Sequence, residues 1–373
     1  MNIVLHDNNK HLDFAPFTLT RPVGDLRIGI MTNVERWKLL LPDAKIGFAT
    51  EDYLQGKYPK IDGFDVNAAV IASKEIVAAL QNLHPTQGIW FNDIWVAGMR
   101  DKAARIELSE APLVLYHRWD LYEMNGAVLA HDFELLTAGR TSRQLSSTNT
   151  IIGDAQHIFL EEGATVEGCT LNTNGGPIYV GQDAEIMEGS LVRGPLAMNE
   201  KSALKLGTKV YGATTLGPHC KVGGEVNNVV FQAFSNKGHD GFLGNSVIGE
   251  WCNLGADTNC SNLKNNYGNV KTYNYRTKTV EQTDVQFMGL MMGDHSKCGI
   301  NTMFNTATVV GVSANVFGAE FPPKYLPSFT WGAGETAYNF DKALESANNM
   351  MKRRGKELST DEIAILKHIA DTE

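Results

Sequence analysis

The sequence predicts an α/β domain followed by a parallel β-helix and a short helical tail. Three observations lead to this prediction. The 373 residues exceed the core of one ordinary domain. The N-terminal part alternates short apolar runs with helical patterns, whereas the C-terminal half repeats apolar residues at a period of six. We therefore expect domains at residues 1–147 (α/β), 148–333 (β-helix) and 334–373 (tail).

The α/β domain is inferred from its alternating pattern. Apolar runs bounded by turn residues predict short strands, and apolar residues at helical spacing predict helices. Residues 129–137 close the region. The predicted strands are residues 1–5, 45–50, 89–98 and 112–115, and the predicted helices are residues 28–41 and 73–83. Alternation of this kind favours a layered structure with a mostly parallel sheet.

The β-helix is predicted by a ladder of apolar residues six positions apart. The ladder is Val180, Ile186, Val192, Met198, Leu204, Val210, Leu216 and Val222. Four positions after each of the first seven comes Ala184, Ser190, Leu196, Ser202, Thr208, Thr214 or Cys220, all small except Leu196. Neither an amphipathic helix nor one alternating strand keeps a period of six. A triangular coil does, because each side turns one aliphatic residue inward, and such coils must stack to bury that face.

The same pattern sets the limits of the solenoid. It begins near Ile151, falters at Asn228, and ends near the two prolines at residues 322–323. It resumes at Phe242, Ile248, Leu254 and Cys260, and weakly at Ile300, Val310 and Val316. Polar residues 264–283 break the period and predict a protruding loop.

The tail is expected to form two helices. The first covers about residues 340–354 and ends in three consecutive basic residues, 352–354. The second opens on a capping box formed by Ser359 and Glu362. We expect this tail to cover the exposed end edge of the solenoid, since an open sheet edge invites unwanted pairing.

Composition excludes several classes of partner. A net charge of −9 and a pI near 5.6 disfavour a nucleic-acid binder, which needs a concentrated basic face. The N-terminus lacks a signal-peptide pattern, and no apolar run approaches the ~20 residues of a membrane span. The five cysteines are odd in number and show no CxxC spacing, which indicates reduced thiols used as small apolar fillers. We therefore expect a cytoplasmic protein.

One histidine stands out within the solenoid. His239 lies in the segment KGHDGFLG, beside an off-period stretch, where a core role is unsuitable. The chemical interpretation is a general base for an amine or hydroxyl; the alternative is a surface histidine in a turn. Downstream, Asn253 and Asn262 could present amides to a sugar or thioester, although asparagines are also common in solenoid turns.

The run KGHDGFLGNSVIGEWCNLGADTNCSN resembles the acetyltransferase half of the bifunctional N-acetylglucosamine-1-phosphate uridyltransferases. The resemblance implies a left-handed parallel β-helix, a homotrimer, and acetyl-CoA as co-substrate. It places the catalytic base at His239 and substrate contacts at Asn253, Asn262 and Glu225, with a loop lysine supplied by Lys264 or Lys271.

This sequence departs from that pattern at the acceptor contacts. Phe242 and Leu263 stand where the family has tyrosines, and Asn227 and Asn228 correspond to two lysines that grip the sugar phosphate. These departures leave the acyl acceptor open.

The N-terminal stretch PFTLTRPVGDLRIG resembles the opening of sugar-phosphate nucleotidyltransferases. The glycine-rich phosphate loop is replaced by residues 7–11, and the lysine of the motif is Val23. Together with the segments around Asp120 and at residues 125–126, the pattern resembles compact nucleotidyltransferases fused to hexapeptide repeats.

This second resemblance implies a sugar 1-phosphate and a nucleoside triphosphate as substrates. Arg21 and Arg27 are candidates for binding the triphosphate, although ion pairs with Asp25 and neighbouring acids explain them equally well. Nucleotidyl transfer implies Mg²⁺, with Asp93 and Asp120 as possible ligands.

We therefore expect a transferase that makes a nucleotide sugar resembling UDP-N-acetylglucosamine, by nucleotidyl transfer and by acetyl transfer to an amino sugar. Two alternatives stay open: nucleotidyl transfer alone with the β-helix as scaffold, or a non-catalytic N-terminal domain on an acyltransferase. A zinc site at His219, His239 and His295 is disfavoured, because separations of 20 and 56 residues supply no close histidine pair. The methionines in residues 288–296 suit simple packing better than a pantetheine channel.

Overall fold

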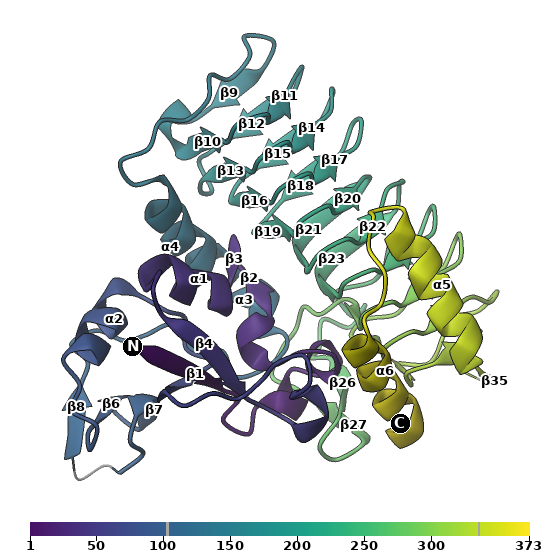
Figure 1. Cartoon of the computed structure of the whole chain (residues 1–373). Coiled ribbons are helices and arrows are strands. Elements are labelled where there is room, and N and C mark those ends of the chain that lie inside the picture. The colour runs from purple at the N-terminus through teal and green to yellow at the C-terminus, as the bar shows by residue number, and fades with distance from the viewer. Residues whose placement is uncertain (102–103, 335) are drawn as a thin grey trace. The chain divides into compact units, whose positions relative to one another are not determined.

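The computed structural model describes residues 1–101, 104–334 and 336–373. It contains two compact units (Figure 1). The first unit comprises Met1–Leu26 and Met31–Arg118, and the second comprises Arg27–Ile30 and Trp119–Glu373. In the described part of the chain, no helix has the length and apolar character needed to cross a bilayer.

The first unit is built on a six-stranded sheet with the order β4-β1-β5-β7-β6-β8. Strand β1 runs parallel to β4 and β5, and β6 runs parallel to β8, whereas β7 is antiparallel to both neighbours. The predicted α/β class is confirmed. The strands are β1 (Asn2–His6), β4 (Lys45–Ala49), β5 (Phe64–Asn67), β6 (Gly88–Phe91), β7 (Ile94–Gly98) and β8 (Arg105–Glu107), accompanied by β3 (Met31–Thr32), α1 (Asn33–Leu40) and α2 (Lys74–Gln81).

Three predicted elements of this unit differ from the structure. The helix expected from residue 28 begins at Asn33, because Thr32 and Glu35 form a capping box there. The strand expected over 89–98 is a hairpin, since Asn92 adopts a left-handed conformation (φ 53°) and turns the chain. The strand expected over 112–115 makes only a single bridge, between Val70 and Val114.

The second unit is a parallel β-helix of triangular coils, as the period of six predicted (Figure 1). Its three sheets are called faces 1, 2 and 3 here. Face 1 contains β10 (Ile158–Leu160), β13 (Ile178–Val180), β16 (Leu196–Met198), β19 (Thr214–Leu216), the ends of β21 (Glu225–Phe231) and β23 (Phe242–Ile248), β28 (Met291–Met292), β31 (Val309–Val310) and β33 (Tyr325–Leu326).

Faces 2 and 3 follow the same order along the stack. Face 2 contains β11 (Thr165–Val166), β14 (Glu185–Ile186), β17 (Ala203–Leu204), β20 (Lys221–Val222), β22 (Asn236–Lys237), β24 (Asn253–Leu254), β29 (Lys297–Cys298), β32 (Asn315–Val316), β34 (Thr330–Trp331) and β35 (Thr336–Ala337). Face 3 contains β9 (Thr150–Ile152), β12 (Thr170–Asn172), β15 (Leu191–Arg193), β18 (Lys209–Tyr211), the starts of β21 and β23, β25 (Asn259–Cys260) and β30 (Met303–Phe304).

Burial confirms the period of six. All eight ladder residues from Val180 to Val222 are at most 3 % exposed, and so are the seven residues that follow them by four positions. Full burial of an aliphatic side chain contributes about 1.5–3 kcal/mol, so the repeated column stabilises every coil. The five cysteines are free and buried, as expected of fillers.

Where the period of six was irregular, the residues that point inward lie one or two positions away from the predicted ones. Leu243 rather than Phe242 points inward, and Ile300 is exposed, whereas Cys298 and Phe304 fill the core. The methionines of residues 288–296 are buried, which confirms the packing interpretation.

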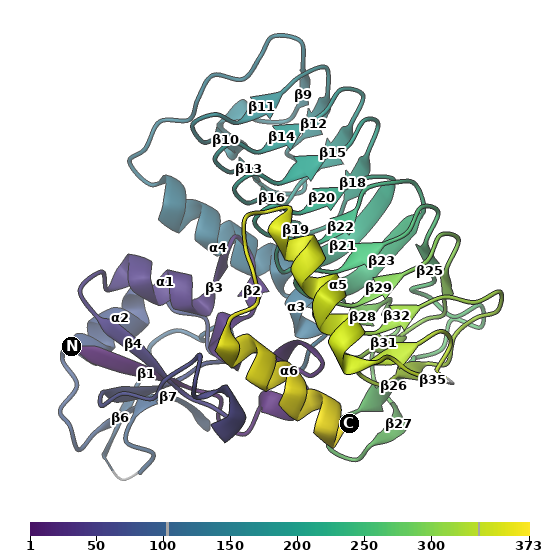
Figure 2. The ribbon, with the colours of Figure 1, turned by 45° about the vertical axis from the view of Figure 1, so that its right-hand side comes forward.

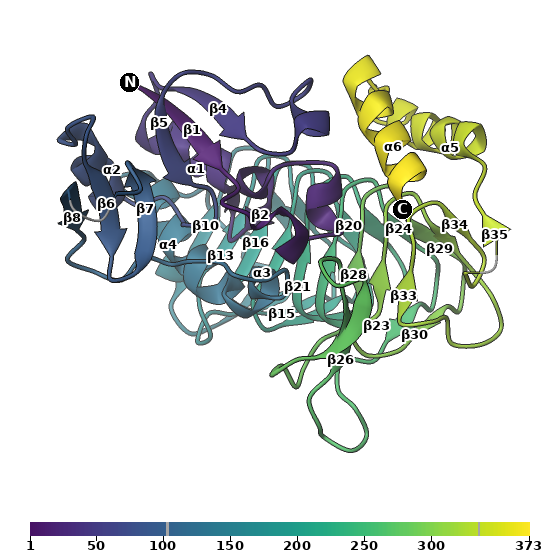
Figure 3. The same cartoon turned by 90° about the horizontal axis from the view of Figure 1, so that it is seen from below.

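The loop and the tail extend from this solenoid. The predicted protruding loop contains a hairpin of β26 (Lys271–Asn274) and β27 (Thr279–Gln282), visible in Figure 3. Helix α5 (Phe340–Lys352) lies along the coils, and the predicted capping box opens α6 (Thr360–Thr372) (Figure 2). The tail contacts the last coil through its first strand rather than through its helices alone, because β35 forms antiparallel hydrogen bonds with β34. Helix α5 lies beside face 2 and not over the end edge.

Two further helices pack on face 1 within this unit. They are α3 (Asp120–Glu123) and α4 (Asn125–Thr137), and the short β2 (Arg27–Ile28) contacts both of them. The Tyr122 hydroxyl donates to the Phe287 carbonyl, and the Asn125 amide donates to the Ala213 carbonyl. These bonds fix the helices against the coils.

Candidate functional site

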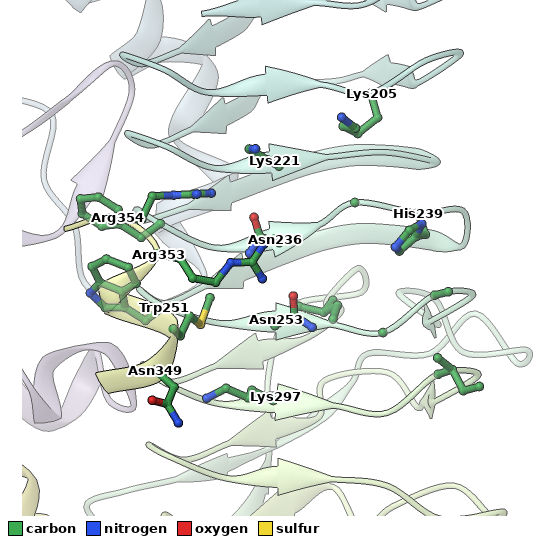
Figure 4. Close-up of a pocket in the computed structure, with 17 residues that line it drawn as sticks. Lys205, Lys221, Asn236, His239, Trp251, Asn253, Lys297, Asn349, Arg353 and Arg354 are labelled. Carbon is green, nitrogen blue, oxygen red and sulfur yellow. The ribbon is translucent and has the colours of Figure 1, made fainter. Parts of the chain in front are cut away.

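A pocket of about 770 Å³ lies between face 2 and α5, entirely within the second unit (Figure 4). His239 and Asn253 both line it, so the structure brings these two predicted residues together. The polar and charged lining residues are Lys205, Lys221, Asn236, His239, Asn253, Lys297, Asn349, Arg353 and Arg354.

His239 is carried by the corner between faces 2 and 3. The corner follows β22 and precedes β23, and Figure 4 shows the imidazole at the end of the coil that carries Asn236, next to the coil that carries Asn253. Gly238 also lines the pocket, so backbone and imidazole are both accessible there. A histidine so placed can accept a proton from a bound amine or hydroxyl.

Five cationic side chains surround the pocket, and no carboxylate is among its lining residues. Lys205 and Lys221 stand on successive coils, Lys297 stands further along the stack, and Arg353 and Arg354 follow the end of α5. Burial lowers the pKa of Lys221, and the charges of Arg354, Lys205 and Arg353 lower it further. Positive charges held this close without acids favour an anionic ligand such as a phosphate.

A stack of aromatic rings forms one end of the pocket wall. The ring centres of His219 and Phe234 are 5.0 Å apart and those of Phe234 and Trp251 are 4.2 Å apart, and the ring planes are nearly parallel in both pairs. The ammonium of Lys356 lies 5.4 Å from the Phe234 ring centre. The His219 ring therefore packs against Phe234. The described residues contain no group of three or more metal-ligating side chains.

Asn262 and Glu225 lie outside this pocket. Asn262 lines a separate pocket with Asn227, Asn228 and Asn245, and its amide donates to the Asn245 side chain at 2.8 Å. The Glu225 carboxylate on face 3 accepts a 2.6 Å hydrogen bond from the Tyr211 hydroxyl, and this bond is the main cause that raises the pKa of Tyr211 to about 12.

The two loop lysines belong to the protruding segment. The Lys264 ammonium donates to the Asn269 carbonyl within the same loop, and Lys271 is exposed on β26 opposite Gln282. Neither lines a pocket with His239. The substrate-binding roles of Glu225, Asn262, Lys264 and Lys271 remain predictions.

The first unit has a pocket of its own, of about 420 Å³. It lies beyond the carboxyl ends of β1 and β5, where ligands bind in open α/β sheets. Its lining residues include Asn8, Lys10, Asn67, Trp90, Asp93, Trp95, Arg100 and Tyr116. The loop after β1 turns through Asn8 and Asn9, both left-handed (φ 51° and 59°), because asparagine tolerates the conformation that glycine usually supplies.

The cations of this pocket contact aromatic rings. The Lys10 ammonium lies 5.4 Å from the Tyr116 ring centre and 3.2 Å from the Asp13 carboxylate. The Arg100 guanidinium lies 4.3 Å from the Trp95 ring centre. Neither cation was among the residues predicted to bind phosphate: Lys10 lies in the segment that replaces the glycine-rich loop, and Arg100 belongs to no recognisable motif.

The predicted phosphate and metal residues are dispersed. Arg21 is buried in the first unit. Arg27 is buried in the second unit, where it donates to the carbonyls of Gln232 and Ile30. Asp93 lines the pocket of the first unit, and Asp120 is a buried residue at the start of α3 in the second. The phosphate-binding and metal-binding roles of these four residues remain predictions.

The Asp93 carboxylate suits one mode of Mg²⁺ binding. Mg²⁺ is commonly held by one or two carboxylates together with substrate phosphates rather than by a full protein cage. Asp93 shares its pocket with Lys10 and Arg100, so a carboxylate and two cationic side chains line one cavity.

A family model matches the N-terminal part of the chain. Residues 3–141 match a family described as "Sugar nucleotidyl transferase". The N-terminal part of the chain is therefore similar to sugar nucleotidyl transferases, and a parallel β-helix follows it.

Among individual proteins, the chain is similar to the bifunctional protein GlmU of Methanocaldococcus jannaschii, with 40 % identity over 73 residues. The match covers 20 % of this chain and 17 % of that relative. Two solved structures share low similarity. The polySia-specific acetyltransferase NeuO matches at 9 % identity and TM-score 0.30, over 56 % of this chain and all of its own. An Arabidopsis UDP-N-acetylglucosamine acyltransferase matches at 13 % identity and TM-score 0.25, over 57 % of this chain and 77 % of its own.

Proposed function

We propose that the pocket beside face 2 transfers an acetyl group from acetyl-CoA to the amine of an amino sugar. The single observation that carries this proposal is the placement of His239 and Asn253 in one pocket with five cations. The cations are suited to the phosphates of coenzyme A. His239 would take the proton from the amine as the amine attacks the thioester, and the Asn253 amide would donate to the oxygen that gains charge.

We propose that the first unit transfers a nucleotidyl group to a sugar 1-phosphate. Lys10 and Arg100 would bind phosphates, and the rings of Trp90, Trp95 and Tyr116 offer apolar surface to a base or sugar. Mg²⁺ held by Asp93 would neutralise the departing pyrophosphate. The expected product is a nucleotide sugar of the UDP-N-acetylglucosamine type, made in the cytoplasm from a nucleoside triphosphate.

We further propose that the protein acts as a homotrimer. Helices α3 and α4 pack on face 1 and α5 lies beside face 2. Outward positions of face 3 carry exposed apolar side chains at Ile152, Leu191, Tyr211 and Met303. Two further copies of this chain would cover them.

The acetyl-transfer proposal is tested by thiol release from acetyl-CoA with glucosamine 1-phosphate and with glucosamine as acceptors. We expect His239→Ala to lower kcat about 10²–10⁴-fold, the usual contribution of a general base. The matched control is His157→Ala, an exposed histidine of the same β-helix outside the pocket. Equal thiol release by wild type and His239→Ala would refute the proposal.

The nucleotidyl-transfer proposal is tested by pyrophosphate release from nucleoside triphosphates with sugar 1-phosphates and Mg²⁺. We expect Lys10→Ala and Arg100→Ala to lower kcat/KM at least tenfold, since each removes a charged phosphate contact. Lys74→Ala, on the exposed start of α2, serves as the control. Pyrophosphate release without thiol release would select the scaffold alternative, and thiol release alone would select the non-catalytic N-terminal domain.

A further inference from the structure

A lysine occupies the core of the β-helix directly before the His239 corner. The inward column of face 2 consists of Val166, Ile186, Leu204, Val222, Lys237, Leu254, Cys298 and Val316. Lys237 is the charged member of this column, and only 1 % of its surface is exposed. Burying an ammonium group is costly, so the stability of the coil does not explain a lysine at this position.

Other corners between faces 2 and 3 are closed by a hydroxyl group. In four coils, a serine or threonine stands four positions after the inward residue of face 2. Its hydroxyl donates to the backbone carbonyl three residues before the serine or threonine, at 2.6–2.8 Å. The donors are Ser190, Thr208, Thr258 and Thr302. Each bond ties the corner to its own strand.

The His239 corner cannot use this device. Its corresponding residue is Gly241, with φ +108°, and a Cβ there would lie 2.2 Å from the Thr258 carbonyl oxygen. A hydroxyl-bearing side chain therefore does not fit. Lys237 supplies a substitute from inside the coil, because its ammonium donates to the His239 carbonyl at 3.0 Å and to the Gly223 carbonyl at 2.9 Å.

The preceding coil makes room for this side chain. Its inward residues Val222 and Val226 are four positions apart, whereas Leu204 and Val210 are six apart. The shortened corner is the pair Gly223–Gly224, and a Cβ at Gly224 would lie 2.9 Å from the Lys237 ammonium. The glycines of the shortened corner thus leave the space that the buried Lys237 side chain occupies.

We propose that Lys237 is a positioning residue for His239, holding the His239 carbonyl and thereby the backbone from which the imidazole reaches the pocket. This inference rests on the proposed acetyl transfer, in which His239 is the base. Lys237 touches no substrate; it acts through the corner.

The test is Lys237→Met, which keeps an unbranched side chain of similar length and matches the apolar column. We expect kcat for acetyl transfer to fall about 10–100-fold, because a charge-assisted hydrogen bond to the His239 carbonyl is lost. The KM for acetyl-CoA should stay within twofold of the wild-type value. The unfolding temperature should be equal or higher, because a buried charge has been removed. A purely structural role would instead lower activity and stability together.

Two variants complete the series. Leu204→Met changes the same column two strands away, and kcat should stay at the wild-type value. Lys237→Gln can still donate one or two hydrogen bonds, so its kcat should fall between those of wild type and Lys237→Met. Unchanged kcat in Lys237→Met, or a loss matched by Leu204→Met, would overturn the inference.

Amide hydrogen exchange gives a readout independent of activity. In Lys237→Met the amides of residues 238–241 should exchange at least tenfold faster, whereas those of residues 255–258 should be unchanged. Unchanged exchange at 238–241 would refute the role of Lys237. A wild-type protein that acetylates no acceptor would instead refute the proposed function, so the two failures are distinguishable.

Discussion

Lys237 shows how burial tunes a single side chain in this protein. Burial lowers its pKa to about 8, and the charges of Asp240 and Asp257 oppose that shift. An unfolded chain would hold the same lysine at its ordinary pKa near 10.4. The folded protein therefore binds this proton more weakly than the unfolded chain does.

A pH dependence of stability follows from this difference. At pH below about 8 both states are protonated, and the folded state bears the full penalty of about 3 kcal/mol. As pH rises from about 8 to about 10.4 the folded lysine is neutral, and the penalty disappears. We expect the stability of wild type relative to Lys237→Met to increase over this window in denaturant titrations, since other groups cancel in the comparison. A flat difference between the two proteins would contradict the shifted pKa.

At the scale of elements, the hexapeptide coil is stabilised chiefly by its inward column. Leu216 is fully buried on face 1, whereas Leu206, ten positions earlier, is 69 % exposed at a corner. The same side chain is therefore buried at one position and exposed to solvent at the other.

We expect Leu216→Ala to lower the free energy of unfolding by about 2–5 kcal/mol, because it removes buried methyl groups and leaves a cavity. Leu206→Ala should change it by no more than about 0.5 kcal/mol. Thermal and denaturant unfolding of the two variants measure this. Equal effects would mean that Leu206 is covered in the assembled protein.

Helix α5 contributes charge to the pocket from outside the solenoid. Its buried residues Ala343, Ala347 and Met351 lie four apart on one face of the helix. Arg353 and Arg354 come directly after its last residue and line the pocket.

The arginines are expected to set the affinity for acetyl-CoA. Replacing both Arg353 and Arg354 with Ala should raise KM for acetyl-CoA about tenfold or more, and the difference should shrink at 0.5 M salt because screening weakens charge pairing. Calorimetric titration of coenzyme A and the kinetics at two salt concentrations test this. Replacing Lys342 and Lys367, which do not line the pocket, controls for loss of charge in the tail.

For the molecule as a whole, the two proposed active-site pockets lie on two different compact units. Each unit has its own core, so inactivating one pocket should leave the other chemistry intact. Measuring thiol release and pyrophosphate release in His239→Ala and in Lys10→Ala tests this independence.

The proposed homotrimer gives a measurable mass. One chain is 40.9 kDa, so light scattering after size exclusion should give about three times that value. Leu191→Glu on the exposed apolar part of face 3 should shift the mass toward one chain, since a buried unpaired charge is costly. A single-chain mass for wild type would refute the trimer.

The sequence by itself determined the β-helix and its core. A period of six is enforced by close packing in each coil, so every inward residue from Val180 to Val222 could be read from spacing alone. The capping box at Ser359 and the buried free cysteines were equally local signals. His239 was recognisable because its glycine-flanked segment breaks that period.

The tertiary structure alone decided what surrounds His239. Residues as distant in sequence as Lys205 and Arg354 line one pocket because α5 returns along face 2, and no local pattern encodes that return. Lys237 looked like an ordinary lysine until strand register placed it in the core column. Local periodicity fixes which way a side chain points, whereas long-range packing fixes which side chains meet.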